Sequence, residues 1–486
     1  MMRMIKTVFR AFVVLLVASS SVFALDSPLH EAVVAGDVSR VRALIADGVD
    51  VNTVDGDGST ALHWAAHYDD LESGQELLAA GADSAIVNQF GVQPIALASE
   101  NGSAEFLQLL LETGANPNTA LPEGETALMT ATRTGRADAV RLLLMHNANP
   151  NMVEGWRGQT ALMWAAAENN REVASALISA DANIHARSTG GFSPLMFAVR
   201  AGHLEMTQLL VNAGANSEET LFDGTSALVL AAKNGHYELG AFLLDRGADP
   251  NADDQGWTAL HEVKWTRRPN LGFNNPPPLV TGSMRDVDFV KALASHGADL
   301  NRRMTKEPNN RYRNVLNRIG STPFLLAAKA ADIEMMRLLV ELGADPLLPN
   351  EDGTTPLMVA AGVGIWAVGE SPGTNEEALA AVQYALELGG EVITVDDNGD
   401  TALHGAIIRS SEPLVRFLLA EGADIDAINE KGWSPLRIAR GVFYSNTGKR
   451  WPEMDVLLHA LGADETLVTG ADNTISDWTV EEADQR

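Results

Sequence analysis

The chain has 486 residues, too many for one compact core, so it folds either as several domains or as an open-ended array of repeats. Hydrophobic residues make up 46% of it, an ordinary fraction for a globular protein, which excludes wholesale disorder. The formal net charge of -29 argues against nucleic-acid binding by the surface as a whole, and the absence of Cys excludes disulfides and thiol chemistry.

Residues 1–24 have the pattern of a cleavable secretory signal peptide. Basic residues precede an apolar run from Ala11 to Ala18, and Ala24 ends a small-residue cleavage site. The run is much shorter than the roughly 20 residues that span a bilayer, so we expect no membrane span after cleavage. We therefore expect an exported protein, periplasmic or secreted. The lack of Cys in so long a chain favours a bacterial periplasm.

An internal repeat fills residues 25–470, and residues 471–486 form a tail. A step of Ser or Thr, then Ala or Pro, then usually Leu recurs, as in "TALHWAA", "TALMWAA" and "SPLMFAV". Nine of the eleven intervals between these steps are 32 to 34 residues long. The Ala or Pro of the step stands at 28, 61, 94, 127, 161, 194, 227, 259, 323, 356, 402 and 435.

Each repeat encodes two helices and a turn. The Ser or Thr caps the first helix, and a Pro is tolerated as the first helical residue. A second helix carries an apolar "LL" pair, and the Gly of a following "GAD" ends it in a left-handed conformation. One such unit cannot bury its own apolar face and must stack on its neighbours.

These units resemble ankyrin repeats. The family signatures stand here as "TALH" at 60–63 and 401–404, and as "GAD" at 247–249 and 422–424. The resemblance implies an all-α solenoid of about twelve helix-turn-helix units with short hairpin turns and inserted loops. In that family, stacked repeats bind other macromolecules along a concave face made by turn tips and first helices.

Four insertions interrupt the period, at about 264–286, 302–319, 362–377 and 441–455. The first two flank the second helix of the eighth unit, and residues 264–318 hold eleven basic and four acidic residues. Long insertions in repeat proteins often serve binding, because the stack does not need them. The alternative is that the basic segments fold back and neutralise acidic repeats. Sequence leaves both readings open.

Candidate partner-binding residues fall into three groups. The inserts carry Arg and aromatic side chains, the residue before the capping Ser or Thr is aromatic in three units, and one position near the end of the first helix is repeatedly basic. The first group is Arg267, Arg268, Arg311, Tyr312 and Arg313; the second is Phe192, Trp257 and Trp433; the third is Arg133, Arg200 and Lys233, with Lys329 at the same position. Packing between turns, or simple solvation, is the competing reading for the last two groups.

No catalytic, metal or cofactor motif is present. The His residues at 30, 63, 261 and 404 occupy a repeat-signature position, where local hydrogen bonds are the usual role. We therefore expect a noncatalytic, monomeric protein-protein interaction scaffold without cofactors, with an acidic partner bound on the concave face and the basic insertions. The alternatives are a binder of an anionic envelope polysaccharide and an accessory subunit of an exported enzyme.

The signal-peptide pattern makes a direct prediction. The mature protein begins at Leu25, because Ala24 ends the small-residue site. N-terminal sequencing of exported material checks this, and a mature chain that starts at Met1 would contradict it.

Overall fold

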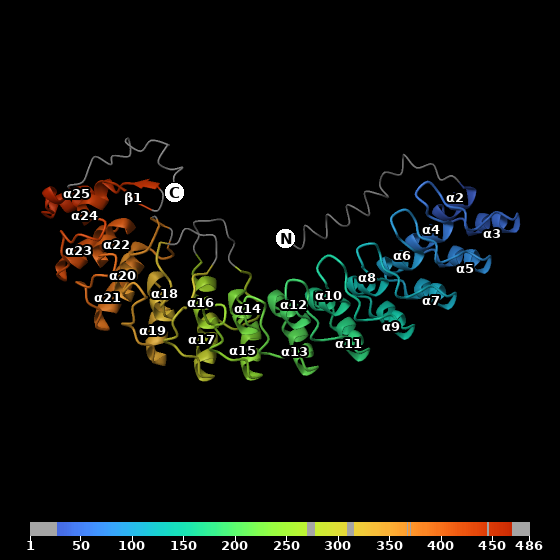
Figure 1. The fold of residues 1–486 in the computed structure, drawn as a ribbon, viewed down its shortest axis with the longest axis horizontal. Helices are drawn as coiled ribbons and strands as arrows, with labels where there is room; N and C mark the ends of the chain where they lie inside the picture. Colours follow the sequence, from blue (N-terminus) through green and yellow to red (C-terminus); the bar gives the residue numbers. More distant parts are fainter. Residues whose placement is uncertain are drawn as a thin grey trace. The chain divides into compact units, whose positions relative to one another are not determined.

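The computed structural model describes residues 27–269, 278–308, 315–366, 368–369, 371–444 and 447–468. The signal peptide and the tail predicted from sequence lie outside these residues. The chain divides into unit 1 (Met1–Ala215) and unit 2 (Asn216–Arg486), and each unit is a stack of helix pairs (Figure 1). We number these pairs as repeats 1 to 6 in unit 1 and repeats 7 to 12 in unit 2.

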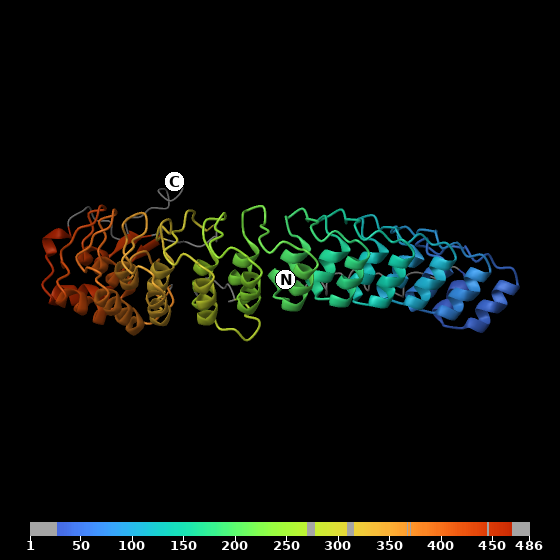
Figure 2. The ribbon, with the colours of Figure 1, turned by 90° about the horizontal axis from the view of Figure 1, so that it is seen from below.

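In unit 1 the first helices of the repeats form one row and the second helices form another (Figure 1). Turns between successive repeats project together along one side of the helix rows (Figure 2). The first helices are α2 (Pro28–Val34), α4 (Ala61–Tyr68), α6 (Pro94–Asn101), α8 (Ala127–Thr134), α10 (Ala161–Glu168) and α12 (Pro194–Ala201). The second helices are α3 (Val38–Ala46), α5 (Leu71–Ala79), α7 (Ala104–Glu112), α9 (Ala137–Met145), α11 (Arg171–Ser179) and α13 (Leu204–Asn212).

Unit 2 repeats this plan with longer connections. Its first helices are α14 (Ala227–Lys233), α16 (Ala259–Arg267), α18 (Pro323–Lys329), α20 (Pro356–Ala361), α22 (Ala402–Arg409) and α24 (Pro435–Arg440). The second helices are α15 (Tyr237–Asp245), α17 (Asp286–Ser295), α19 (Ile333–Leu342), α21 (Asn375–Glu387), α23 (Glu412–Ala420) and α25 (Pro452–Ala460). Strands β1 (Val442–Tyr444) and β2 (Thr447–Lys449) pair antiparallel between α24 and α25, and a 3-10 turn, Glu465–Leu467, follows α25.

The sequence correctly predicted where each first helix begins. In all twelve described repeats, the Ala or Pro of the recurring step is the first residue of the first helix. The preceding Ser or Thr caps it, as where the Ser193 hydroxyl accepts a hydrogen bond from the Met196 N–H at 3.1 Å. Repeat 3 departs from this pattern, since Gln93 stands at the cap and makes no side-chain cap bond. The twelve helix pairs confirm the predicted helix-turn-helix repeat.

Close packing between successive second helices depends on two glycines. A Cβ on Gly74 of α5 would lie 2.7 Å from the Phe106 ring of α7, which is fully buried. Gly240 of α15 stands in the same relation to Phe289 of α17. Because the glycine of one repeat has no side chain, the phenyl ring of the next repeat fills the space beside it. Each repeat buries its apolar face only when its neighbour is present.

Asn side chains tie the ends of the second helices together from repeat to repeat. The Asn52 amide donates to the Gly81 carbonyl at 3.2 Å and accepts from the Asp83 N–H at 2.7 Å. The same pair of bonds is made by Asn118, Asn151 and Asn251. This ladder explains the Asn of "GVDVN", "GANPN" and "GADPN", because its amide satisfies backbone groups left free where a helix ends.

The predicted structural role of the signature His residues is confirmed. The Nδ1 of His261 accepts from the Thr258 N–H at 3.2 Å, and its Nε2 donates to the Ser321 carbonyl of the next repeat at 3.3 Å. His63 and His404 bridge their repeats in the same way. Burial lowers the pKa of His261 to about 4, and it also lowers the pKa values of His63 and His404.

His261 should make stability depend on pH. Its folded pKa of about 4 lies below the usual 6.5, so the unfolded chain binds more protons between these values. Stability contributed by the neutral ring is complete above pH 6.5 and is lost as pH falls toward 4. The free energy of unfolding should fall by about 3 kcal/mol over this range, since each tenfold change in proton affinity corresponds to about 1.4 kcal/mol.

Urea unfolding at pH 7.5 and pH 5 measures this dependence. His261→Gln should lose less stability between the two pH values than the wild-type chain, because Gln does not titrate. The exposed His185→Gln is the control and should behave like the wild-type chain. Equal pH dependence in all three proteins would contradict the role assigned to His261.

Candidate functional site

The two arginines at the start of the first insertion bind carboxylates of their own chain. Arg267 is the last residue of α16, and its side chain is 14% exposed. Its guanidinium donates to Asp332 at 2.5 Å and to Asp286 at 2.7 Å, and it also contacts Glu334. These acids lie on α17, on α19 and at the N-cap of α19, so one guanidinium joins repeats 8 and 9.

Arg268 extends this clamp to repeat 10. Its guanidinium donates to Glu377 of α21 at 2.9 Å and to the Ala330 carbonyl at 3.2 Å. This bond is the main reason that the pKa of Glu377 is lowered. Arg267 and Arg268 therefore neutralise acidic neighbours, which is the second of the two readings that the sequence left open. Arg311, Tyr312 and Arg313 lie outside the described residues.

Three described basic residues of the second insertion, Arg302, Lys306 and Arg318, also find partners in the chain. Arg302 pairs with Asp253 at 2.8 Å, and the Lys306 ammonium donates to the Asp254 carbonyl at 2.6 Å. Arg318, only 2% exposed, pairs with Glu307 at 2.8 Å and lies over the Trp265 ring at the end of α16. The basic segment thus folds back on the acidic turn that precedes repeat 8 and on its own Glu.

The second insertion of repeat 8 and the insertions of repeats 10 and 12 contact neighbouring segments of unit 2. Leu316 packs closely on Gly364, which lies just after α20. A Cβ added to Gly364 would lie 2.6 Å from the Leu316 side chain. The Lys449 ammonium lies 4.2 Å from the centre of the Trp366 ring, and the Trp451 indole N–H donates to the Ile408 carbonyl at 3.0 Å. Chain segments added to the repeats therefore cover the C-terminal ends of several first helices in unit 2.

The aromatic residues predicted at turn tips are half-buried. Phe192 packs on Phe197 with ring centres 5.3 Å apart, and the Trp257 indole donates to Glu262 at 2.6 Å. Glu262 is itself buried, which raises its pKa. Both rings are thus placed by contacts with the first helix of their own repeat, whereas the alternative stated from the sequence was packing between adjacent turns.

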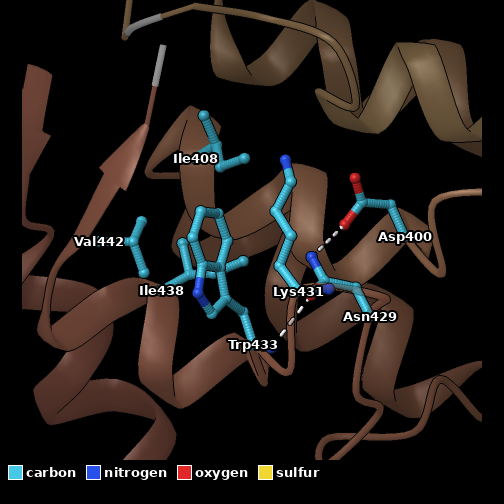
Figure 3. Close-up of a pocket in the computed structure, with 7 residues that line it drawn as sticks. All are labelled: Asp400, Ile408, Asn429, Lys431, Trp433, Ile438 and Val442. Atoms are coloured by element: carbon cyan, nitrogen blue, oxygen red, sulfur yellow. Dashed lines mark hydrogen bonds between the residues drawn. The ribbon is translucent and has the colours of Figure 1, made fainter. Parts of the chain in front are cut away.

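Trp433 lines a small pocket in repeats 11 and 12 (Figure 3). The Lys431 ammonium lies 5.0 Å from the ring centre, and the Asn429 amide donates to Asp400 at 2.8 Å. The pocket is lined by Asp400, Ile408, Asn429, Lys431, Trp433, Ile438 and Val442. Its enclosed space is about 10 Å³, which is room for one water molecule rather than for a ligand.

In unit 1 the predicted basic position holds Arg133 and Arg200 in different surroundings. Arg133 is in the last turn of α8 and lies 3.7 Å from Glu125. Arg200 is in the last turn of α12, and its guanidinium lies 4.7 Å from the centre of the Phe192 ring. The intervening repeat has Ala167 at this position, so the two arginines do not form a continuous strip.

In unit 2 the same position holds Lys233 and Lys329. Lys233 is exposed at the end of α14, where its charge acts on the buried Glu262. Lys329 is 3% exposed and donates to the Gly364 carbonyl at 3.0 Å. Trp265 occupies the position between them. A shared repeat position therefore does not give these cations a shared environment.

The sequence did not lead us to three aromatic side chains that are exposed at turn tips. They are Phe90 and Trp156 in unit 1 and Phe222 in unit 2, with exposed fractions of 42%, 76% and 73%. Arg157 follows Trp156, and its guanidinium lies 4.7 Å from the centre of the indole ring. A signal existed for this pair, because "GWRG" lies in the one 34-residue interval of unit 1.

Neither a metal centre nor a membrane-spanning helix is found among the described residues. There, no group of three or more His, Cys, Asp or Glu side chains could hold a metal ion. None of the helices described is long and apolar enough to cross a bilayer.

Comparison with models of protein families identifies the family of these repeats. The model "Ankyrin repeats (3 copies)" matches residues 67–154, 95–188, 148–221, 195–270 and 374–441, which together exceed half of the chain. The chain belongs to the ankyrin-repeat family. "Ankyrin repeats (many copies)" also matches residues 29–73, and "Ankyrin repeat" matches residues 319–351.

Relatives of this ankyrin-repeat protein match over short stretches. The nuclear factor NF-kappa-B p105 subunit of Gallus gallus is 29% identical over 153 residues, which are 31% of this chain and 14% of that protein. The RelA-associated inhibitor of Mus musculus is 38% identical over 61 residues, 13% of this chain and 7% of that protein. The human ASB11 ankyrin repeat domain is 30% identical with a TM-score of 0.42, covering 46% of this chain and 99% of that domain. The chain thus spans a small part of these two curated relatives.

Arg267 should behave as a structural residue. Arg267→Gln removes the nearer cation of the buried Asp332 carboxylate and leaves only Arg268, 3.6 Å away, and we expect unfolding to become easier by about 2 kcal/mol. Thermal unfolding measures the change, and hydrogen exchange locates it in α16 to α19.

The matched control for this variant is Arg285→Gln. Arg285 is an exposed arginine whose one ion pair with described residues is with Asp288 of its own helix turn, so its loss should change the melting temperature little. An equal effect of both variants would show that Arg267 is no clamp.

Proposed function

We propose that this ankyrin-repeat protein is a noncatalytic, monomeric scaffold that binds a partner protein through unit 1. The binding surface is the first-helix face, formed by the exposed side of the first helices and the adjoining turn tips. The family implies binding of macromolecules on such a face, and one relative is named as an inhibitor associated with RelA. Export, with cleavage of residues 1–24, is part of the proposal.

The observation that carries the proposal is the difference between the two units. In unit 2, insertions cover helix ends of repeats 8 to 12 with side chains of the chain itself. In unit 1, α2 to α13 follow one another without such insertions, and Tyr68, Phe90 and Trp156 are exposed. Aromatic side chains and arginines are enriched where protein partners bind, and they dominate the binding energy.

The basic insertions have a smaller part in this proposal than the sequence alone indicated. Arg267 and Arg268 have carboxylate partners within the chain, so a partner that bound them would first have to break those pairs. Arg311, Tyr312 and Arg313 remain candidate contacts predicted from the sequence.

Site-specific photocrosslinking tests the binding surface. A photoreactive amino acid at Glu100 of α6 or at Arg133 of α8 lies on the first-helix face. In the cells that produce the protein, we expect discrete adducts from both positions that protease digestion of the partner removes. The same amino acid at Gln108 of α7 or Arg171 of α11, exposed on second helices, is the control and should give none. Equal adducts from all four positions, or none, would contradict the proposal. Protease-resistant adducts would favour the polysaccharide alternative.

A further inference from the structure

Four residues of repeats 5 and 6 form what we call the Trp156–Arg200 patch: Trp156, Arg157, Phe192 and Arg200. Trp156 and Arg157 stand at the tip of the turn that precedes α10, and Phe192 stands in the turn that precedes α12. Arg200 lies in the last turn of α12. All four belong to unit 1.

The turn that carries Trp156 and Arg157 is held firmly. The buried carboxylate of Glu154 accepts hydrogen bonds from the backbone N–H groups of Trp156, Arg157 and Gln159, at 2.7 to 2.9 Å. The Arg157 carbonyl accepts from both the N–H and the hydroxyl of Thr189 in the next turn, at 2.8 and 3.0 Å. Two exposed side chains are thus presented on an ordered backbone, which lowers the entropy cost of binding.

Each guanidinium of the patch rests on an aromatic ring. Arg157 lies over Trp156 at 4.7 Å, and Arg200 lies over Phe192 at 4.7 Å and over Phe197 at 5.1 Å. A ring under one face of a guanidinium fixes its plane and leaves its edge N–H groups directed outward. Those edges match the two oxygens of a carboxylate.

The two positive charges also act on each other. Burial, and then the charge of Arg157, lower the pKa of the Arg200 guanidinium. Some other arginines of unit 1 pair with acids, as Arg42 pairs with Glu72 at 2.7 Å and Arg133 lies 3.7 Å from Glu125. Among the described residues, no carboxylate lies within 4.0 Å of the Arg157 guanidinium. An anion bound at Arg157 would therefore lessen its repulsion with Arg200.

We propose that the Trp156–Arg200 patch binds an acidic, unstructured segment of a partner protein. Its carboxylates pair with Arg157 and Arg200, and an apolar side chain between them packs on Trp156 and Phe192. The inference rests on the proposed function and adds the chemistry of the partner. A nucleic acid or long polyanion fits poorly, because the chain outside this patch carries all 64 acidic residues and would repel a charged backbone that extends past it.

The test is selection from a displayed library of random twelve-residue peptides against the full exported chain. Enriched peptides should carry at least two Asp or Glu beside an aromatic or aliphatic residue. An enriched peptide, labelled and followed by fluorescence anisotropy, should bind about tenfold more weakly to Trp156→Ala and to the double variant Arg157→Gln, Arg200→Gln. Its affinity should also fall as salt rises, since exposed charges are screened over about 8 to 10 Å at physiological ionic strength.

The matched control is Arg171→Gln, an exposed arginine on α11 that should leave peptide affinity unchanged. Circular dichroism of each variant shows whether the fold is kept. Enrichment of neutral or basic peptides, the absence of any enrichment, or acidic peptides that bind the double variant equally well would each overturn the inference. Crosslinking from Glu100 and Arg133 that survives in the double variant would then leave the proposed function standing.

Discussion

Stacking is the constraint on which the rest of this structure depends. A helix pair of this size has an apolar face that only the next pair can bury, so each repeat is completed by its neighbour. The contacts that express this are specific. The Phe106 ring fills the space left by Gly74, the Asn52 amide closes the end of the next helix, and His63 reaches the carbonyl of the following turn. Successive turns are also joined through their backbones, as where the Gln89 N–H donates to the Asp57 carbonyl at 2.9 Å. These contacts do not use the exposed side chains of the turn tips and first helices, so those side chains are free to vary.

The two units use that freedom in different ways. Unit 2 has added segments at helix junctions, and their cations are satisfied by carboxylates and carbonyls of neighbouring repeats. A buried pair of this kind stabilises only as a whole, because either partner alone would be a buried charge. In unit 1 the described repeats keep a period of 33 or 34 residues, and they differ from one another mainly in single exposed side chains. Phe90 and Trp156 are exposed there, and so is Tyr68, whose ring stacks on Trp64 with ring centres 6.1 Å apart.

The Trp156–Arg200 patch shows how little sequence change makes a distinct surface. One extra residue in the turn before repeat 5 brings Trp156 and Arg157 to its tip, and Glu154 holds the longer turn by accepting from its backbone N–H groups. In repeat 6, Phe192 stands where repeat 4 has Glu125. Arg200 therefore lies over a ring, whereas Arg133 lies near an acid. The same arginine position thus has an acid beside it in one repeat and an aromatic ring beneath it in another.

By itself, the sequence determined the repeat, its period and the first residue of every first helix in the described chain. These follow from local rules: a hydroxyl that caps a helix, a Pro tolerated at its first turn, and a Gly that ends it. It also identified the basic segment that starts at Arg267, but it could not decide between a binding site and an internal clamp. Only the tertiary structure shows that Arg267 and Arg268 pair with carboxylates of the chain, because Asp332 and Glu377 stand 65 and 109 residues further along it. The exposure of Trp156 and the half-burial of Phe192, Trp257 and Trp433 were decided in the same way. Local sequence sets the turn in which each ring stands, but its contacts form only when that turn packs in the folded chain. Phe192 meets Phe197 and Trp257 meets Glu262 of their own repeats, and Trp433 lies beside Ile408 of the preceding repeat.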